Sequence, residues 1–407
     1  MVPSTPVADL GPLGLDSGGH VLLSLALQKL APGAIVEVVG QAGDLVPMIR
    51  AWSTANGHRF TTERPPGWPI AEFPRAVGYL ERGPHAEARW VGASAAGESK
   101  PGVVADHAPP EWGLVSRGVW IEAGGPQPHF ALSAKTTLWS DDVARLYDRA
   151  LAGQWDPATA VPWDAPRSNE PEVERAVVQV MGYLVENEEA ALVVPARFLG
   201  QIHPHFAEVQ HILAATIADE ARHAHTFARR ARLSEVGPSL SGAGGRASLQ
   251  TLLDEPDFAT ASFLLSVLGE GSFLSLLGFL ERHGPDECTR SIARLVRADE
   301  ARHVAFGLAH LERHCSLEPD LRPRLARAVE RRHDDLRNTA GLNQSVFDSL
   351  VILAGGGTTP EAIGAGWKAV QELQVDMQTG RESRLARLGF SSGESQALAS
   401  LHTRNFM

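Results

Sequence analysis

The pentapeptide Asp-Glu-Ala-Arg-His occurs twice in the chain, eighty residues apart. Each copy places a glutamate and a histidine three residues apart, as Glu220 with His223 and Glu300 with His303. On a helix such a pair lies on one face, with Cβ atoms roughly 5–6 Å apart. Carboxylate oxygens and imidazole nitrogens are ligands for divalent metals. Each copy is therefore a candidate half of a metal site.

Apolar residues at helical spacing place both motifs on inner helix faces. One series leads onto the face that holds Glu220 and His223, and a second shares its face with Glu300 and His303. The first series consists of Phe206, Val209, Leu213 and Ile217, and the second consists of Ile292 and Val296. Both pairs are predicted to point into the protein interior.

Inward-pointing ionisable groups need a balancing charge, because burying an ion without a partner costs several kcal/mol. A pair of metal ions would supply it. Di-metal carboxylate bundles take one glutamate from each of two helices and a Glu-x-x-His pair from each of the other two. Glu270 is the single charged residue in the apolar stretch 258–280, thirty residues before Glu300. It is the predicted ligand from the third helix.

The first helix offers three glutamates, and helical register separates them. Glu188 continues the apolar stripe, whereas Glu189 lies about 100° and Glu186 about 200° round an ideal helix. We predict Glu188 as the ligand and keep Glu189 and Glu186 as alternatives. The stripe consists of Val177, Met181, Leu184 and Leu192. Four carboxylates would balance two divalent cations, and oxygen and nitrogen ligands without thiolate favour iron or manganese.

The aspartates and arginines of the pentapeptides are expected to support the histidines. A metal-bound histidine usually donates its other ring N–H to a carboxylate, which fixes its tautomer. Asp219 and Asp299 are the candidates, each serving the histidine of the opposite motif. Arg222 and Arg302 would neutralise those aspartates. Each pentapeptide would then form half of one symmetric site.

Four long helical segments are predicted to carry these residues. The first begins near Asn169, which resembles a capping box with Glu172, and has Pro171 in its first turn. The others span about 206–233, 257–282 and 286–315. The first and third loops are short, whereas more than twenty residues separate the second and third helices. Two hairpins joined by a long crossover predict a ferritin-like four-helix bundle, with extra C-terminal helices.

The texture of the chain divides it into three parts. Residues 1–90 alternate short apolar runs with short helical patterns, which predicts a small α/β domain. Residues 91–135 are rich in Gly, Ala and Pro and are expected to be an irregular connector. Residues 136–407 have a helical period almost throughout. The fold class is thus mainly α, with a small α/β domain in front.

Composition excludes several classes of function. The net charge of −11 and the lack of a basic tract disfavour a nucleic-acid partner. The apolar stretch 258–280 is nearly long enough to span a membrane, but Glu270 in its middle favours a buried helix of a bundle. Only two cysteines, Cys288 and Cys315, and no leader-like N-terminus lead us to expect a cytoplasmic protein.

Glu188, Glu270 and the two pentapeptides resemble the ferritin-like di-iron carboxylate superfamily. That superfamily includes the ribonucleotide reductase small subunit, bacterial multicomponent monooxygenases, p-aminobenzoate N-oxygenase and ferritins, and the pentapeptides look most like the monooxygenase form. The N-oxygenase branch has a further histidine ligand where this chain has Val296. Arylamine N-oxygenation is therefore not implied.

The resemblance implies a cofactor of two iron ions, with a mixed Mn/Fe pair as the second composition. It also implies an O₂-dependent oxidase or oxygenase. Its catalytic residues would be the four glutamates, Glu188, Glu220, Glu270 and Glu300. Expected partners are O₂ and a small or carrier-linked organic substrate, with a reductase or carrier protein, and a homodimer is compatible with it. Iron handling or peroxide detoxification is the first alternative function. A metal-stabilised structural or binding protein is the second.

The N-terminal domain resembles the TusA-like sulfur-carrier fold. The resemblance rests on "LGPLGLDSGGHVLLSLALQKLAPGAIVEVVG" and "IRAWSTANGHRF". In that family a cysteine near the start of the first helix carries sulfur, whereas this chain has Leu15 and Asp16 in the matching region. A docking or scaffold role is expected in place of sulfur transfer.

Overall fold

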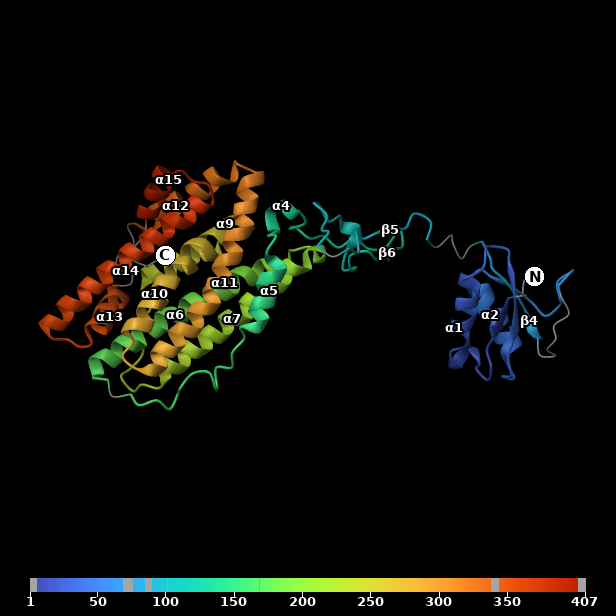
Figure 1. Cartoon of the computed structure of the whole chain (residues 1–407), viewed down its shortest axis with the longest axis horizontal. Helices are drawn as coiled ribbons and strands as arrows, with labels where there is room; N and C mark the ends of the chain where they lie inside the picture. The colour runs from blue at the N-terminus through green and yellow to red at the C-terminus, as the bar shows by residue number, and fades with distance from the viewer. Residues whose placement is uncertain are drawn as a thin grey trace. The chain divides into compact units, whose positions relative to one another are not determined.

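The computed structural model describes residues 6–68, 76–84, 90–100, 102–167, 169–337 and 344–401. Contacts divide the chain into two compact units (Figure 1). The first comprises Met1–Ala96 and Gly118–Pro126, and the second comprises Gly97–Arg117 and Gln127–Met407. The expected connector at 91–135 is thus shared between the two units.

The first unit is a small α/β domain, as expected. A four-stranded sheet has the order β1-β2-β4-β3, with β1 parallel to β2 and the other pairs antiparallel. Its elements are β1 (Val7–Asp9), α1 (Gly19–Gln28), β2 (Ile35–Val39), α2 (Leu45–Ala55), β3 (Arg59–Thr61) and β4 (Ala76–Glu81), and β5 (Ser94–Ala95) pairs separately with β6 (Trp120–Ile121). The chain therefore runs βαβαββ through the main sheet.

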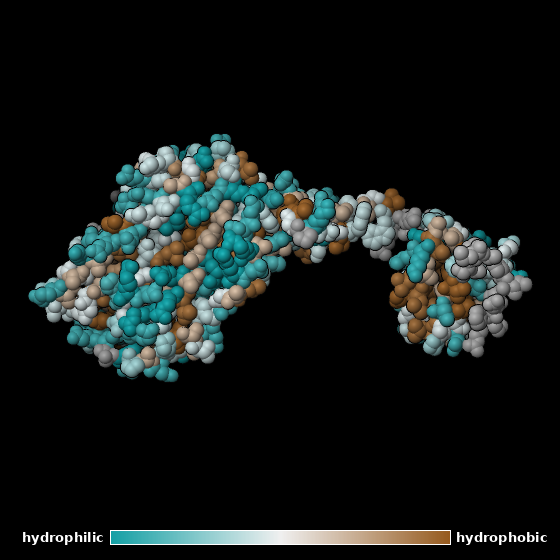
Figure 2. Space-filling model, viewed as in Figure 1, coloured by the Kyte–Doolittle hydropathy of each residue, from teal (hydrophilic) through white to brown (hydrophobic). Residues whose placement is uncertain are grey.

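Helices α1 and α2 bury one face each against the sheet. Leu23 and Leu27 of α1 and Ile49 of α2 pack on Val36 and Leu80 of the strands in one apolar core. Val36 and Val38 of β2 are two positions apart and so face the same side of the sheet, where both join this core. Figure 2 shows apolar surface over α1 as well. Val21 and Leu25, each 49% exposed, contribute to it.

The second unit is helical. Its main helices are α6 (Pro171–Leu199), α7 (Ala207–Arg232), the composite helix of α9 (Phe258–Ser262), η4 (Phe263–Glu270) and α10 (Gly271–His283), and α11 (Glu287–Leu317). Smaller or later helices are α4 (Lys135–Leu138), α5 (Val143–Ala152), α8 (Ala243–Leu253), α12 (Leu321–Leu336), α13 (Gln344–Gly355), α14 (Pro360–Arg387) and α15 (Ser392–Ser400). Short 3₁₀ turns precede α7 and occur twice earlier in the chain.

The four main helices form the bundle that the sequence predicts. Helix α6 packs along α7, and α10 packs along α11, so that two antiparallel hairpins lie side by side (Figure 1). Residues 233–257, which include α8, connect the hairpins. Among the added C-terminal helices, α13 covers α6 and α14 covers α10. The expected ferritin-like bundle with extra C-terminal helices is therefore confirmed.

The starts of these helices are set by different caps. Asp257 and Asp286 each accept a hydrogen bond from the backbone N–H three residues later, which satisfies a free amide of the first turn. Pro171 is the first residue of α6, as predicted. The predicted capping box at Asn169 is wrong, because Glu170 is the N-cap residue and has no side-chain cap bond.

Asn169 is instead part of a buried charge cluster at one end of the bundle. Its Nδ2 donates to Glu174 and to Asp286 at 2.7 and 3.2 Å. Arg230, which is fully buried, donates to the same two carboxylates at 2.7 Å each. Burial opposes ionisation of Glu174 and Asp286, but the guanidinium of Arg230 holds the pKa of both carboxyls below the ordinary value. The cluster ties α6, α7 and the start of α11 together.

The third bundle helix is very apolar. Among the described residues, Phe258–His283 is the one helix long and apolar enough to cross a membrane, and 83% of its most apolar window is buried inside the protein. Such burial is typical of a core helix. Its middle is not α-helical, because Phe263–Glu270 adopts the wider π-helical pattern. The sequence pattern predicts an ordinary helix over about 257–282, and the π-helical segment departs from that prediction.

Arg230→Met should lower the free energy of unfolding by about 3–5 kcal/mol at neutral pH, because it leaves buried carboxylates without their cation. The lowered pKa values of Glu174 and Asp286 stabilise the fold above the ordinary carboxyl pKa of roughly 4, and that contribution is lost as the pH falls through the lowered values. The difference from wild type should therefore shrink in acid. Urea unfolding at several pH values measures it, with the exposed Arg232→Met as control. A pH-independent difference would contradict the assignment.

Candidate metal centre

The six predicted ligands come together in the bundle core. Glu188 lies on α6, Glu220 and His223 on α7, Glu270 at the end of η4, and Glu300 and His303 on α11. All six side chains are buried. Their ligand atoms form two groups of four, each within 4.8 Å. The first group is Glu188, Glu220, His223 and Glu300, and the second is Glu220, Glu270, Glu300 and His303.

Glu220 and Glu300 belong to both groups. A carboxylate has two oxygens and can place one on each of two adjacent cations. Glu188 and His223 belong only to the first group, and Glu270 and His303 only to the second. The arrangement would therefore hold two cations, one with Glu188 and His223 and one with Glu270 and His303, and Glu220 and Glu300 could serve both.

The helical register of α6 resolves the three alternatives on the first helix. Glu188 is buried and lies in the first group, 3.4 Å from Nδ1 of His223. Glu189 is exposed and Glu186 is half-buried, and neither is in a ligand group. The structure thus places Glu188, and not the two alternatives, at the centre.

The electrostatics of the cluster call for cations. Burial, together with the neighbouring carboxylates, raises the pKa of Glu188 and of Glu270 well above the ordinary value. Burial also opposes charge on His223, but its hydrogen bond to Asp299 and the negative charge of the carboxylates around it raise the pKa of the imidazole. Glu188 and Glu270 would therefore hold protons unless cations lay beside them. Burial opposes ionisation of Glu220 too, but the neighbouring His303 and His223 lower the pKa of its carboxyl well below the ordinary value.

Unpartnered polar atoms fit the same interpretation. Both oxygens of Glu220 and Glu270, and Nδ1 of His223 and His303, are buried without a hydrogen-bond partner among the described residues. Each Nδ1 nevertheless lies within 2.9–3.4 Å of carboxylate oxygens of the cluster. Unpaired buried polar atoms are costly, and two divalent cations would provide these atoms with partners and balance the four carboxylates.

The far nitrogen of each histidine contacts the aspartate of the other motif. His223 Nε2 lies 3.0 Å from Asp299 Oδ2, and His303 Nε2 lies 3.3 Å from Asp219 Oδ2. An ionised aspartate accepts from Nε2–H, which leaves the Nδ1 lone pair directed at the cluster. The crossed arrangement is the one that the sequence predicts.

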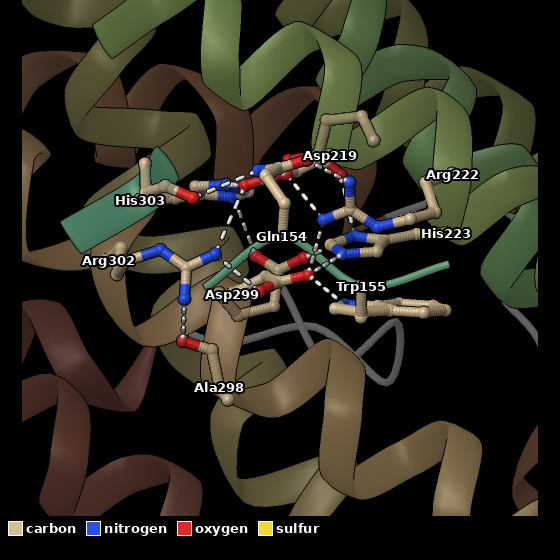
Figure 3. Close-up of polar contacts among 12 residues, drawn as sticks. Gln154, Trp155, Asp219, Arg222, His223, Ala298, Asp299, Arg302 and His303 are labelled. Carbon is tan, nitrogen blue, oxygen red and sulfur yellow. Dashed lines mark hydrogen bonds and ion pairs between the residues drawn. The ribbon is translucent and has the colours of Figure 1, made fainter. Parts of the chain in front are cut away.

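The two arginines hold both aspartates from opposite sides (Figure 3). Arg222 Nη2 donates to Asp219 at 2.5 Å and to Asp299 at 2.8 Å. Arg302 Nη2 donates to the same pair, at 3.3 Å to Asp219 and in a shorter contact to Asp299. Burial opposes ionisation of Asp299, but its contacts with His223 and Arg222 lower the pKa of the carboxyl below the ordinary value. Both aspartates are therefore kept anionic.

Two further residues, which the sequence analysis missed, complete this layer. Gln154 Nε2 donates to Asp219 at 2.8 Å, and Trp155 Nε1 donates to Asp299 at 2.7 Å. Both follow the end of α5, in a loop without periodicity that would mark them. The Trp155 ring also lies beneath the guanidinium of Arg222 and stacks on His223. The two halves of the site are thus similar but not identical.

A small cavity reaches one side of the centre. It measures about 20 Å³, room for roughly one water molecule. Glu270 and His303 line it, whereas Glu188 and His223 do not. Its other lining residues are mainly apolar: Val194, Pro195, Phe198, Leu213, Thr216, Phe258, Ser262, Leu265, Ser266 and Phe306. The second cation position is the one that faces this cavity.

The cysteines remain outside the site. Cys288 and Cys315 are both buried and free, and burial raises the pKa of each thiol to about 11. A thiol with a raised pKa is a poor nucleophile and a poor metal ligand at neutral pH. The donor set of the centre is therefore made of oxygen and nitrogen.

Metal content should follow the overlap of the two groups. Glu220→Ala and Glu300→Ala remove a shared carboxylate and should reduce bound metal from two ions per chain to almost none, whereas Glu188→Gln and Glu270→Gln should each leave about one. Elemental analysis of protein loaded with metal measures the ratio. Glu189→Gln, at the surface next to Glu188, is the matched control and should retain both ions. Equal losses in all four ligand variants would argue against two distinct positions.

Asp219→Asn and Asp299→Asn should weaken metal binding about 10–100-fold, because an amide orients the histidine without the charge of the aspartate. Competition with a chelating dye measures the affinity for Co(II). The exposed Asp142→Asn, which removes only a surface pair with Arg145, serves as control. Unchanged affinity in both variants would show that the crossed contacts do not tune the histidines.

Comparisons with known proteins give distant likenesses only. No family model matches the chain, and no curated protein matches it. Among solved structures, a variant of an R2-like ligand-binding oxidase with an aerobically reconstituted Fe/Fe cofactor is 16% identical, covers 61% of this chain and 93% of its own, and has a TM-score of 0.47. Another variant, with an Mn/Fe cofactor, is 17% identical, covers 65% of this chain and 91% of its own, and has a TM-score of 0.38. The R2-like ligand-binding oxidase from Sulfolobus acidocaldarius is 15% identical, covers 58% of this chain and 89% of its own, and has a TM-score of 0.36.

Proposed function

We propose that the chain is an O₂-activating oxidase or oxygenase that holds a pair of metal ions, either two irons or one manganese and one iron. The observation that carries the proposal is the pair of overlapping ligand groups that share Glu220 and Glu300 in the bundle core. Carboxylate and imidazole ligands without thiolate suit these metals. Two of the solved structures that the chain is similar to contain an Fe/Fe and an Mn/Fe cofactor, respectively.

The metal pair would supply the electron-transfer chemistry with O₂, and the protein side chains would control its surroundings. Asp219 and Asp299 hold the histidines with Nδ1 toward the cluster. Arg222 and Arg302 keep those aspartates anionic. The apolar cavity limits water at the second position, next to Glu270. A redox centre gains from such exclusion because side reactions with water are suppressed.

The cavity supports a small or slender organic substrate. Its apolar wall favours a hydrocarbon part next to Glu270, and Ser262, Ser266 and Thr216 are its neutral polar groups. At about 20 Å³ it is too narrow for a bulky molecule without movement of side chains. A substrate attached to a carrier would present one end of a chain in the same way.

The N-terminal unit supports a docking role. The sulfur-carrier resemblance of this unit is part of the proposal, with docking in place of sulfur transfer because the chain has no cysteine before Cys288. The exposed Val21 and Leu25 on α1 offer apolar contact surface. We propose that this unit binds a reductase or carrier protein in the cytoplasm. We also propose that the chain assembles as a homodimer.

Anaerobic loading with Fe(II) followed by rapid mixing with O₂ tests the activity. Wild type and Glu189→Gln should consume O₂ in proportion to bound Fe(II) and develop a transient visible absorption, whereas Glu220→Ala and Glu300→Ala should not, because both groups lose a ligand. O₂ uptake in wild type no faster than in Glu220→Ala would refute the proposal. Continued uptake of iron with growth of a ferric mineral would point to iron storage.

A further inference from the structure

The helix that carries Glu270 leaves the α-helical pattern immediately before that residue. The backbone amide of Gly271 has the Ser266 carbonyl, five residues back, among its acceptors, and does not have Val267 among them. In an α-helix the same amide would donate to Val267, four residues back. The π-helical pattern of η4 therefore takes the Val267 carbonyl away from its ordinary helical donor.

Arg384 of α14 replaces that donor. Its Nε donates to the Val267 carbonyl at 2.6 Å. The guanidinium lies directly over Gly271, where a Cβ would be 2.4 Å from Nε and 2.5 Å from Cζ. A Cβ at Gly380, one turn earlier on α14, would lie 3.0 Å from Nη1. A side chain at residue 271 would thus push the arginine off the carbonyl.

A second arginine of α14 supports the next carbonyl of the segment. Ser272 Oγ donates to the Leu268 carbonyl at 2.7 Å. Arg381 Nη2 donates to Ser272 Oγ at 3.4 Å, and its Nη1 donates to the Ala399 carbonyl at 2.9 Å. Two successive carbonyls at the end of η4, those of residues 267 and 268, are therefore held by contacts that lead to α14.

The charges of these arginines make a packing role alone a poor explanation. Among the described residues, the contacts of Arg381 and Arg384 are with neutral acceptors and include no ion pair. Burial lowers the pKa of each guanidinium to about 10. Arg381 is buried and Arg384 is half-buried, and a cation withdrawn from water without a carboxylate is costly, whereas an apolar side chain would fill the same space without that cost. The two arginines differ from apolar side chains in donating hydrogen bonds, to the Val267 carbonyl of η4 and to Ser272 Oγ.

We propose that Arg384, seated on Gly271 and assisted by Arg381, is a positioning residue that holds the π-helical register of η4 and so directs Glu270 into its ligand group. One residue of helical register turns a side chain by about 100°. Relaxation of η4 to an α-helix would thus turn Glu270 away from the second cation position. The inference rests on the metal centre proposed above, but the register of η4 can be measured without metal.

Amide hydrogen exchange of the full-length metal-free protein gives the first readout. Arg384→Met removes the donor, and Gly271→Ala displaces it while leaving the arginine in place. Both should speed exchange in residues 263–272 by about tenfold, the effect of losing one hydrogen bond to a charged group. Arg387→Met, which removes a surface pair with Glu312 one turn along α14, should leave the segment unchanged.

Co(II) titration of the same proteins gives the second readout. Wild type and the controls should bind two Co(II) per chain, while Arg384→Met and Gly271→Ala should retain one and bind the other about 10–100-fold more weakly. Gly278→Ala is the matched glycine control, because the three atoms nearest to a Cβ there belong to the flexible side chain of Arg297, the closest at 3.0 Å. Arg384→Lys keeps one donor and should restore part of the loss.

The two readouts separate the inference from the function on which it rests. Wild-type exchange and wild-type Co(II) binding in both Arg384→Met and Gly271→Ala would overturn the proposal. Faster exchange in residues 263–272 with unchanged Co(II) binding would also overturn it, since the arginine would then stabilise the helix without directing Glu270. If wild type bound no Co(II), the metal centre would fail, and an unchanged exchange rate would independently exclude control of the η4 register by Arg384.

Discussion

Four carboxylates buried in the core of one helix bundle repel one another unless cations lie between them. The rest of the helical unit depends on this constraint. Four long helices bring the carboxylates together, the crossed contacts of Asp219 and Asp299 direct two imidazoles at them, and Arg222 and Arg302 offset the charge of those aspartates. The protein thus balances the outer charges with its own cations and leaves the inner four carboxylates for a metal pair.

The repeated pentapeptide makes the ligand set symmetric, but the surroundings make the two positions different. Trp155 donates a hydrogen bond to Asp299, which contacts His223, whereas Gln154 donates to Asp219, which contacts His303. The cavity touches Glu270 and His303 and not their counterparts. The glutamate of the second position also comes from a π-helical segment. These differences place a small, mainly apolar cavity beside Glu270 and His303 and none of its lining beside Glu188 or His223.

Much of this arrangement could be predicted from sequence because it depends on local spacing. A glutamate and a histidine three residues apart, such as Glu220 and His223, share a helix face wherever they occur in a helix. The apolar stripe of α6 distinguishes Glu188 from the exposed Glu189. Contacts between distant segments could not be predicted in the same way. Trp155 comes from a loop without periodicity, and Arg384 reaches η4 from a helix more than a hundred residues later. The capping box at Asn169 failed because Glu170 is the N-cap residue of α6, and the Asn169 amide donates to Glu174 and to the distant Asp286.

Anomalous diffraction from metal-loaded crystals, recorded at the absorption edge of the bound metal, tests the central claim most directly. The account predicts two separate peaks in the bundle core, one among Glu188, Glu220, His223 and Glu300 and the other among Glu220, Glu270, Glu300 and His303, with Glu220 and Glu300 in contact with both. A single peak, or peaks away from these side chains, would contradict it.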